Sequence, residues 1–197
     1  NILFYSHRIN TSKELLTIPN HYGIEIDLRD ENNNLILAHD PFTSGEKFDD
    51  FLQQYDKHSI ILNIKSERIE SRVLASLKQY KIENYFFLDC SFPMIYNLHK
   101  LGENNIAIRY SEFESIETID LVKHMVKWVW VDCFQNFPLD IISYNKIKKF
   151  GLKICLVSPE LQGHDIKNIK VFKEIIIKNN FKIDAICTKF SNIKYWK

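Results

Sequence analysis

Short apolar runs alternate along the chain with longer segments in which apolar residues recur every three or four positions. The runs are rich in β-branched and aromatic residues, which predicts strands, whereas the spacing in the longer segments predicts amphipathic helices. A further extended segment, 35–38, follows an Asn-Asn-Asn turn. The eight main strands predicted in this way cover residues 2–6, 23–28, 59–64, 85–88, 106–110, 128–131, 152–157 and 183–187.

Signals for helix ends lie between these strands. Thr11 and Glu14 have the spacing of a capping box, and Ser66 is a candidate N-cap for the helix after the third strand. Gly102 and Gly151 are placed to end two later helices. Strands and helices therefore alternate, which predicts an α/β protein with a (β/α)₈ (TIM) barrel. An open doubly wound sheet is the alternative, but its glycine-rich nucleotide fingerprints do not occur in the sequence.

The length of 197 residues predicts a single domain, 1–197. Barrels of this type typically need about 250 residues, so a compact version with short helices is expected. The last predicted strand ends near Cys187, and the residues after it leave no room for a full final helix. A second copy of the chain could cover that gap, so a homo-oligomer is a further expectation.

Composition excludes several classes of function. Lysine and arginine number 26 against 25 acidic residues, so an electrostatic case for nucleic acid is absent. The longest apolar runs fall well short of the ~20 residues that span a bilayer, which argues against stable membrane insertion. The first residues lack the order of a secretory signal, and the four cysteines are widely spaced. We therefore expect a cytoplasmic protein with reduced, mostly buried thiols.

Unusual polar residues collect at or near the predicted strand ends. Glu25 and Asp27 are two positions apart, so on a strand both point to one face, and a divalent cation would offset their repulsion. A solvated edge strand is the alternative reading. Asn63 and Lys65 repeat this spacing on the next strand, where the amide oxygen could join the metal ligands. Such oxygen ligands suit Mg²⁺ or Ca²⁺, with Mn²⁺ as a further option.

Two histidines follow neighbouring predicted segments. His7 comes after the first strand and His39 after the short extension, and imidazole is the side chain that titrates closest to neutral pH. A lone histidine is commonly a hydrogen-bonded structural residue, but a pair beside two carboxylates favours acid–base chemistry. Together with the cations Arg8 and Lys65, this set fits attack on a phosphodiester.

At this point the motifs resemble those of a known family. His7-Arg8, Glu25-Ile26-Asp27, His39-Asp40 and Leu62-Asn63-Ile64-Lys65 are similar to the ordered signatures of glycerophosphodiester phosphodiesterases, and Asp184–Thr188 resembles the last strand of that family. The resemblance implies a barrel fold and phosphodiester hydrolysis. It also implies that His7 and His39 act as acid and base, that Glu25 and Asp27 bind a divalent metal, and that Arg8 and Lys65 contact phosphate.

The chain departs from this pattern at several positions. Ile9 stands where the family has glycine, the first loop looks shortened, and Asn63 replaces an acidic metal ligand. The neutral ligand is expected to weaken metal binding or change its preference, and Glu112 or Glu160 is a candidate to compensate. Glu160 and Trp130, on or after later strands, are also candidate substrate contacts.

The leading hypothesis is a metal-dependent phosphodiesterase that hydrolyses a small glycerol- or sugar-linked diester. One alternative keeps the same site but uses an internal hydroxyl as nucleophile and releases a cyclic phosphate. The other alternative is a barrel that binds a phosphorylated ligand without turnover, for which Asn63 and the altered first loop are the support.

Overall fold

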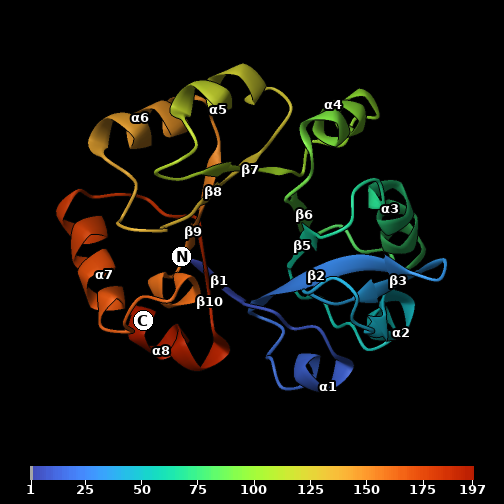
Figure 1. Cartoon of the computed structure of the whole chain (residues 1–197). Helices are drawn as coiled ribbons and strands as arrows, with labels where there is room; N and C mark the ends of the chain where they lie inside the picture. The colour runs from blue at the N-terminus through green and yellow to red at the C-terminus, as the bar shows by residue number, and fades with distance from the viewer. Residues whose placement is uncertain (1) are drawn as a thin grey trace. The chain divides into compact units, whose positions relative to one another are not determined.

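The computed structural model describes residues 2–197, and it contains all eight predicted parallel strands (Figure 1). A hairpin of β2 (Gly23–Glu31) with β3 (Asn34–Leu37), extended by β4 (Glu46–Lys47), adds antiparallel pairing. The parallel strands are β1 (Leu3–Ser6), β2 (Gly23–Glu31), β5 (Ile60–Ile64), β6 (Tyr85–Leu88), β7 (Ala107–Tyr110), β8 (Trp128–Val131), β9 (Lys153–Val157) and β10 (Ala185–Thr188).

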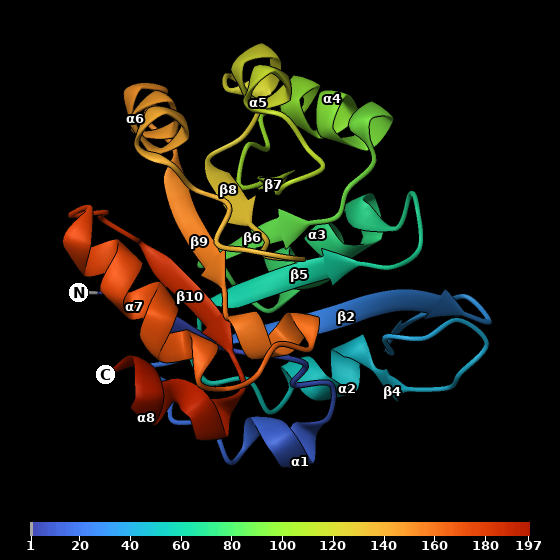
Figure 2. The same cartoon turned by 60° about the vertical axis from the view of Figure 1, so that its left-hand side comes forward.

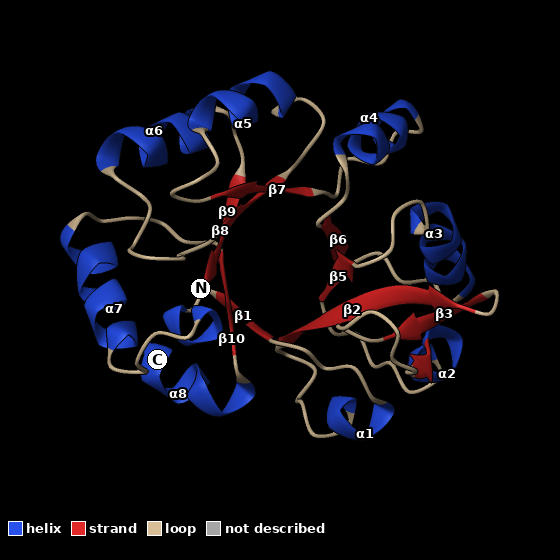
Figure 3. Ribbon diagram, in the orientation of Figure 1, coloured by secondary structure: helices blue, strands red, loops and turns tan. Residues whose placement is uncertain are grey.

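Helical segments follow the parallel strands, in the order of a (β/α)₈ fold (Figure 3). The last helix is a single turn, as the length of the chain predicted. The α-helices are α1 (Ser12–Leu15), α2 (Phe48–Leu52), α3 (Glu70–Gln79), α4 (Phe92–Lys100), α5 (Ile116–Val122), α6 (Ile141–Lys149), α7 (Asn168–Lys178) and α8 (Ile193–Trp196), and the 3₁₀ turns are η1 (Pro159–Gln162) and η2 (Phe190–Asn192).

The chain divides into two compact units. The N-terminal unit is Tyr5–Glu103, and the C-terminal unit is residues 104–197 together with the start of β1. Strand β1 contributes to both, because Leu3 donates its backbone N–H to Asp184 (3.1 Å), whereas Tyr5 and Ser6 pair with β2.

In the N-terminal unit β2 is the central strand, paired with β1, β5 and the antiparallel β3. Its residues alternate strictly between two faces. Ile24, Ile26 and Leu28 are fully buried on one face, and Glu25 and Asp27 lie on the other. The register with β5 sets Asp27 directly opposite Asn63. Strand geometry therefore gathers the predicted polar residues on one face.

A glycine and an aromatic ring shape the start of that polar face. Gly23 lies opposite Tyr5, and a Cβ at Gly23 would come within 2.3 Å of the tyrosine ring. The ring contacts Phe86 edge-on at 5.7 Å, and the hydroxyl bonds to Ser59 at 2.5 Å. Glycine is therefore required here because the tyrosine occupies the space of a side chain.

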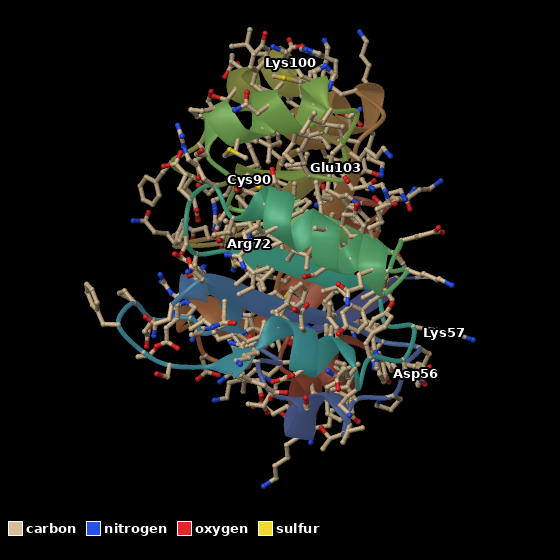
Figure 4. All side chains as sticks on the ribbon, turned by 90° about the vertical axis from the view of Figure 1, so that its right-hand side faces the viewer. Asp56, Lys57, Arg72, Cys90, Lys100 and Glu103 are labelled. Atoms are coloured by element: carbon tan, nitrogen blue, oxygen red, sulfur yellow. The ribbon has the colours of Figure 1, made fainter. Side chains whose placement is uncertain are left out.

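Helices α2 and α3 lie on one side of β2 and β5 (Figure 1). Figure 4 looks onto these helices and shows Arg72 on α3 and Cys90 on the loop after β6. The Arg72 guanidinium donates to the carbonyl of Asn33 at 2.6 Å, which ties α3 to the turn between β2 and β3. Consistent with the sequence prediction, Cys133, Cys155 and Cys187 are buried, and Cys90 is only partly exposed.

In the C-terminal unit four parallel strands run in the order β10, β9, β8, β7. The register aligns Arg109, Trp130 and Cys155 on one face of these strands. The turns η1 and η2 and the helix α8 follow the last strands, and the indole N–H of Trp196 donates to the Ser158 hydroxyl at 2.8 Å.

Two local predictions fared differently. Thr11 and Glu14 form the predicted capping box of α1. Ser66 does not cap the next helix, because Arg68 takes a left-handed conformation and delays the helix until Glu70. The Ser66 hydroxyl instead accepts the backbone N–H of Asp30 at 3.4 Å.

No helix in residues 2–197 has both the length and the apolar character that crossing a membrane requires.

Candidate active site

Seven of the nine predicted site residues belong to the N-terminal unit, where they lie on or shortly after strands β1, β2, β3 and β5. Among parallel strands, side chains at the carboxyl ends meet on the same edge of a sheet, which is where α/β folds bind ligands. The structure joins these residues through hydrogen bonds and ion pairs. They are His7, Arg8, Glu25, Asp27, His39, Asn63 and Lys65.

The carboxylates Glu25 and Asp27 are buried, with 1% and 0% of their surfaces exposed. Glu25 accepts the backbone N–H of Arg8 at 2.7 Å and the side-chain amide of Asn63 at 2.9 Å. Arg8 adopts a positive φ of 56°, a strained conformation for a residue other than glycine. The turn after β1 therefore bends sharply over Glu25 and directs a donor at its carboxylate.

Burial and charge repulsion act on this carboxylate pair. Burial, and secondly the neighbouring charge of Asp27, raise the pKa of Glu25 to about 7, against the hydrogen bonds from Asn63 and Arg8 and the charge of Lys65. A raised carboxyl pKa means that the ionised form lacks enough favourable partners. A cation held between the two side chains would supply such a partner.

Among the predicted metal ligands, two buried oxygens have no hydrogen-bond donor within residues 2–197. These are Oδ1 of Asp27 and Oδ1 of Asn63, on residues that lie directly opposite in the strand register. An unsatisfied buried acceptor is unfavourable, and a hard divalent cation is bound by oxygens of this kind. Residues 2–197 contain no cluster of three His, Cys, Asp or Glu side chains arranged for a metal, so the predicted set is two carboxylates and one amide. The donor chemistry of these three side chains fits a hard cation.

The His39 ring lies between the carboxylate of Asp40 and the guanidinium of Arg8. Its Nδ1 lies 2.7 Å from Oδ1 of Asp40, and its Nε2 lies 2.6 Å from the Arg8 guanidinium. Because a guanidinium only donates hydrogen bonds, Nε2 accepts and Nδ1 donates to Asp40. The hydrogen bond with His39 leads the interactions that lower the pKa of Asp40. Asp40 therefore stays ionised and fixes the orientation and tautomer of the ring.

His7 and Lys65 lie at the two carboxylates. Nε2 of His7 is 3.8 Å from Oε2 of Glu25, and Nζ of Lys65 is 3.8 Å from Oδ1 of Asp27. Lys65 also lies 3.6 Å from Asp89, on the loop after β6. Both side chains keep about a fifth of their surface exposed, at 20% and 18%. Each therefore presents a polar group to solvent while contacting a buried carboxylate.

Two side chains that the sequence analysis did not single out hold this arrangement. Asn10 donates to Oδ2 of Asp27 and accepts the backbone N–H of the same residue, both at 2.9 Å. Arg29 donates to the carbonyl of His39 at 2.7 Å and to that of Lys65 at 3.1 Å. The signal for Asn10 was its place just after His7 and Arg8. Arg29 gave none, because a charged residue in a hairpin strand is common.

The other two predicted residues belong to the C-terminal unit. Trp130 is buried on the face of β8 that it shares with Arg109, and its indole N–H has no hydrogen-bond acceptor among the described residues. The Glu160 carboxylate accepts hydrogen bonds from Thr188 (2.6 Å), Asn192 (3.1 Å) and the Ser158 hydroxyl. Burial favours the neutral form of Glu160, but these hydrogen bonds together lower its pKa.

The observed contacts of Glu160 thus link η1 to the end of β10 and to η2, and its role toward substrate stays a prediction. Glu112, the other candidate for compensating Asn63, accepts three backbone N–H groups after β8, at 2.7 to 3.2 Å.

Neither a protein-family model nor a curated protein sequence matches this chain. Solved structures do. A protein from Agrobacterium tumefaciens, provisionally described as a glycerophosphoryl diester phosphodiesterase, aligns with a TM-score of 0.69 over 98% of this chain and 96% of its own, at 13% identity. A glycerophosphoryl diester phosphodiesterase from Parabacteroides distasonis aligns with a TM-score of 0.64 over 98% of this chain and 84% of its own, at 12% identity.

This chain has the fold of the glycerophosphodiester phosphodiesterases. The (β/α)₈ fold expected from the strand pattern and from the motif resemblance is thereby confirmed. A third structure, a glycerol uptake operon antiterminator-related protein from Thermotoga maritima, aligns with a TM-score of 0.57 over 100% of this chain and 99% of its own, at 12% identity. Differently described proteins thus share this fold, so the fold alone does not determine the function.

Proposed function

We propose that this chain is a metal-dependent phosphodiesterase that hydrolyses a small glycerol- or sugar-linked phosphodiester. The observation that supports this most strongly is the linked set around Glu25, in which His7, Arg8 and Asn63 all contact one buried carboxylate. The glycerophosphodiester phosphodiesterases that share the fold support the substrate class.

His39 is the proposed general base. Its Nε2 carries the lone pair, and Asp40 stabilises the positive charge that forms when the ring takes a proton from water. Arg8 must move its guanidinium from Nε2 to the phosphate for this to occur. The substrate anion provides the reason for that movement, because it offers the arginine a charged acceptor in place of a neutral one.

His7 is the proposed general acid. The negative charge of Glu25, 3.8 Å from Nε2, favours the protonated ring when that carboxylate is ionised. A protonated imidazole at this position donates a proton to the leaving alkoxide, so that the alcohol product departs uncharged.

Glu25, Asp27 and Asn63 would hold the divalent cation, with Mg²⁺ or Ca²⁺ as first candidates and Mn²⁺ as a further one. Such a cation would supply positive charge against the phosphoryl oxygens. Lys65 keeps its ammonium beside Asp27, where it also offsets carboxylate charge and can contact a phosphate oxygen.

The test is hydrolysis of a panel of glycerophosphodiesters, with and without a chelator. We expect His7→Ala and His39→Ala to lower kcat by about 10²–10⁴-fold. His21→Ala is the matched control, because His21 is exposed before the start of β2. Full activity in both site variants would overturn the proposal, and ³¹P NMR of the products would detect the cyclic phosphate of an internal nucleophile.

A non-catalytic binding barrel is the competing reading, since Asn63 replaces a charged ligand. Calorimetry separates the two. Binding of a diester without turnover and without uptake of Mg²⁺, Ca²⁺ or Mn²⁺ would favour the binding protein.

The expected setting of the enzyme is also a proposal. We expect it to act in the cytoplasm on a small molecule, without nucleic acid as a partner. A homo-oligomer is a further part of this expectation. Sedimentation equilibrium of the purified chain measures this directly, and a monomer at all concentrations would contradict it.

A further inference from the structure

The near-neutral net charge of the chain conceals a strong separation of charge along the sequence. Residues 141–197 contain twelve lysines against four acidic residues, a net charge of +8. Residues 1–140 contain fourteen basic and twenty-one acidic residues, a net charge of −7. The last third of the chain is therefore strongly basic, which a global count of charge does not reveal.

Helix α7 carries part of this charge on an exposed face. Ile166, Lys170, Lys173 and Ile177 follow one another at intervals of three or four, so they lie along one side of the helix and its approach. Ile177 is 73% exposed and Ile166 is 41% exposed. Aliphatic side chains thus stand at both ends of a row whose centre is basic.

Helix α8 lies beside α7 and extends this surface (Figure 2). Tyr195 of α8 is 47% exposed, and its carbonyl accepts a hydrogen bond from Lys173 at 3.1 Å. A groove of about 350 Å³ lies here, lined by both kinds of side chain. Its lining residues are Ile166, Lys167, Ile169, Lys170, Lys173 and Tyr195. We call Ile166, Lys167, Lys170, Lys173, Ile177 and Tyr195 the basic–apolar face.

We propose that the basic–apolar face docks the protein on an anionic phospholipid bilayer. Lysines beside exposed isoleucine and tyrosine side chains are the combination that binds a membrane surface, because the ammonium groups meet lipid phosphates while the apolar groups enter the interface. Nucleic acid would use the lysines but would leave the isoleucines in water. The charge of the face is complementary to an anionic bilayer, and this docking is independent of any catalytic activity.

Helix α7 lies on the surface rather than across the bilayer in this arrangement. It is eleven residues long, and its Ile169 and Phe172 side chains are buried in the unit. Only the exposed side chains enter the interface. Attachment is therefore peripheral and dependent on salt, because screening weakens the attraction between lysines and lipid headgroups.

The experiment is co-sedimentation of the full chain with large vesicles. The vesicles contain phosphatidylcholine alone or with about one third phosphatidylserine, and each is measured in about 0.1 M and 0.5 M salt. We expect sedimentation with the anionic vesicles in low salt only. The combined variant Lys167→Glu, Lys170→Glu and Lys173→Glu is expected to lower the partition coefficient at least about tenfold.

Two further variants identify the cause. Lys78→Glu, Lys100→Glu and Lys127→Glu together change the net charge equally at exposed positions outside this face, and this control is expected to stay within about twofold of the parent chain. Ile166→Ser with Ile177→Ser is expected to weaken binding several-fold while keeping its salt dependence.

Equal losses in the two lysine variants, or no binding of the parent chain to anionic vesicles, would overturn the proposal. Self-association in vesicle-free solution that the Lys167, Lys170 and Lys173 changes abolish would do so too, since the occupant would then be a second copy.

Discussion

At the scale of single residues, Asn63 decides the character of the candidate metal site. Its amide nitrogen donates to Glu25, and its oxygen is buried without a donor beside the equally unsatisfied Oδ1 of Asp27. A carboxylate in its place could not donate to Glu25, so three buried negative groups would repel one another. The amide therefore makes the unfilled site more stable and lowers its attraction for a cation.

Asn63→Asp should consequently have opposite effects with and without metal. In EDTA we expect a loss of about 1–3 kcal/mol in the free energy of unfolding, because a donor is lost and a charge is buried. With saturating Mg²⁺, Ca²⁺ or Mn²⁺ the variant should regain stability and bind the cation more tightly than the parent chain. Thermal unfolding with and without cation measures both effects, and a variant that no cation stabilises would contradict the metal site.

Glu25 gives a prediction about pH. Its pKa of about 7 in the folded chain lies above the 4.5 of the free side chain, so the folded state holds a proton that the unfolded state has lost. The contribution of Glu25 to stability is full below pH 4.5, falls as the pH rises through 7, and is then lost. The total change is on the order of 3 kcal/mol.

Glu25→Gln should remove this part of the pH dependence. Urea unfolding of the metal-free chain between about pH 5 and pH 8 tests it, with Glu174→Gln on the exposed face of α7 as a matched control. If the free energy of unfolding changes with pH by the same slope in the parent chain and in Glu25→Gln, the prediction is wrong. The Glu25 carboxyl group would then not be desolvated in the folded chain.

At the scale of elements, the strands could be predicted well and the helix starts less well. Alternation of apolar and charged residues indicates strands such as β2, where Glu25 and Asp27 had to share a face once a strand was recognised. The start of α3 could not be predicted from Ser66, because the left-handed turn at Arg68 depends on where the chain must go rather than on local capping.

The contacts of the predicted site residues could likewise be predicted where strands pair, but not where a loop is involved. The contact of Asp27 with Asn63 follows from pairing of neighbouring strands, whereas the double hydrogen bond of Asn10 to Asp27 depends on the path of a loop. Spacing on a strand predicts faces, but it does not predict which loop residue returns to them. Asn10 was therefore visible as a polar residue near the site, but its contact was not.

Glu160 yields the prediction for the C-terminal elements. Because its carboxylate joins η1 to Thr188 and Asn192, Glu160→Gln should lower the free energy of unfolding by about 1–2 kcal/mol at pH 7. Its pKa is lowered in the folded chain, so the ionised form adds stability above pH 4.5, and that stability is lost as the pH falls through the lowered pKa. The difference between parent and variant should therefore shrink in acid, as urea unfolding would show.

The same variant tests the substrate prediction made from sequence. A structural role changes the free energy of unfolding and leaves the KM of a hydrolysed diester close to that of the parent chain. A rise in KM with unchanged stability would instead assign Glu160 to substrate binding.

At the scale of the whole molecule, the question is whether the two compact units unfold together. Strand β1 is common to both, because Leu3 bonds to Asp184 in one unit while Tyr5 and Ser6 pair with β2 in the other. Because the chain passes from one unit into the other within this strand, we expect the unfolding of the two units to be coupled. The prediction of one domain over residues 1–197 implies a single cooperative transition.

The positions of the tryptophans make that prediction measurable. Trp128, Trp130 and Trp196 all belong to the C-terminal unit, so their fluorescence reports on that unit alone, whereas far-UV circular dichroism reports on both. Gly23→Ala perturbs only the N-terminal unit, because its new Cβ meets the Tyr5 ring. We expect a loss of about 1–3 kcal/mol in the free energy of unfolding, seen equally by both methods.

In a Tyr5→Leu background the same substitution should be less harmful, because the ring that it meets is absent. A fluorescence midpoint that ignores Gly23→Ala, while circular dichroism splits into two steps, would instead establish two independently folding units, because the damage would then have stopped at β1.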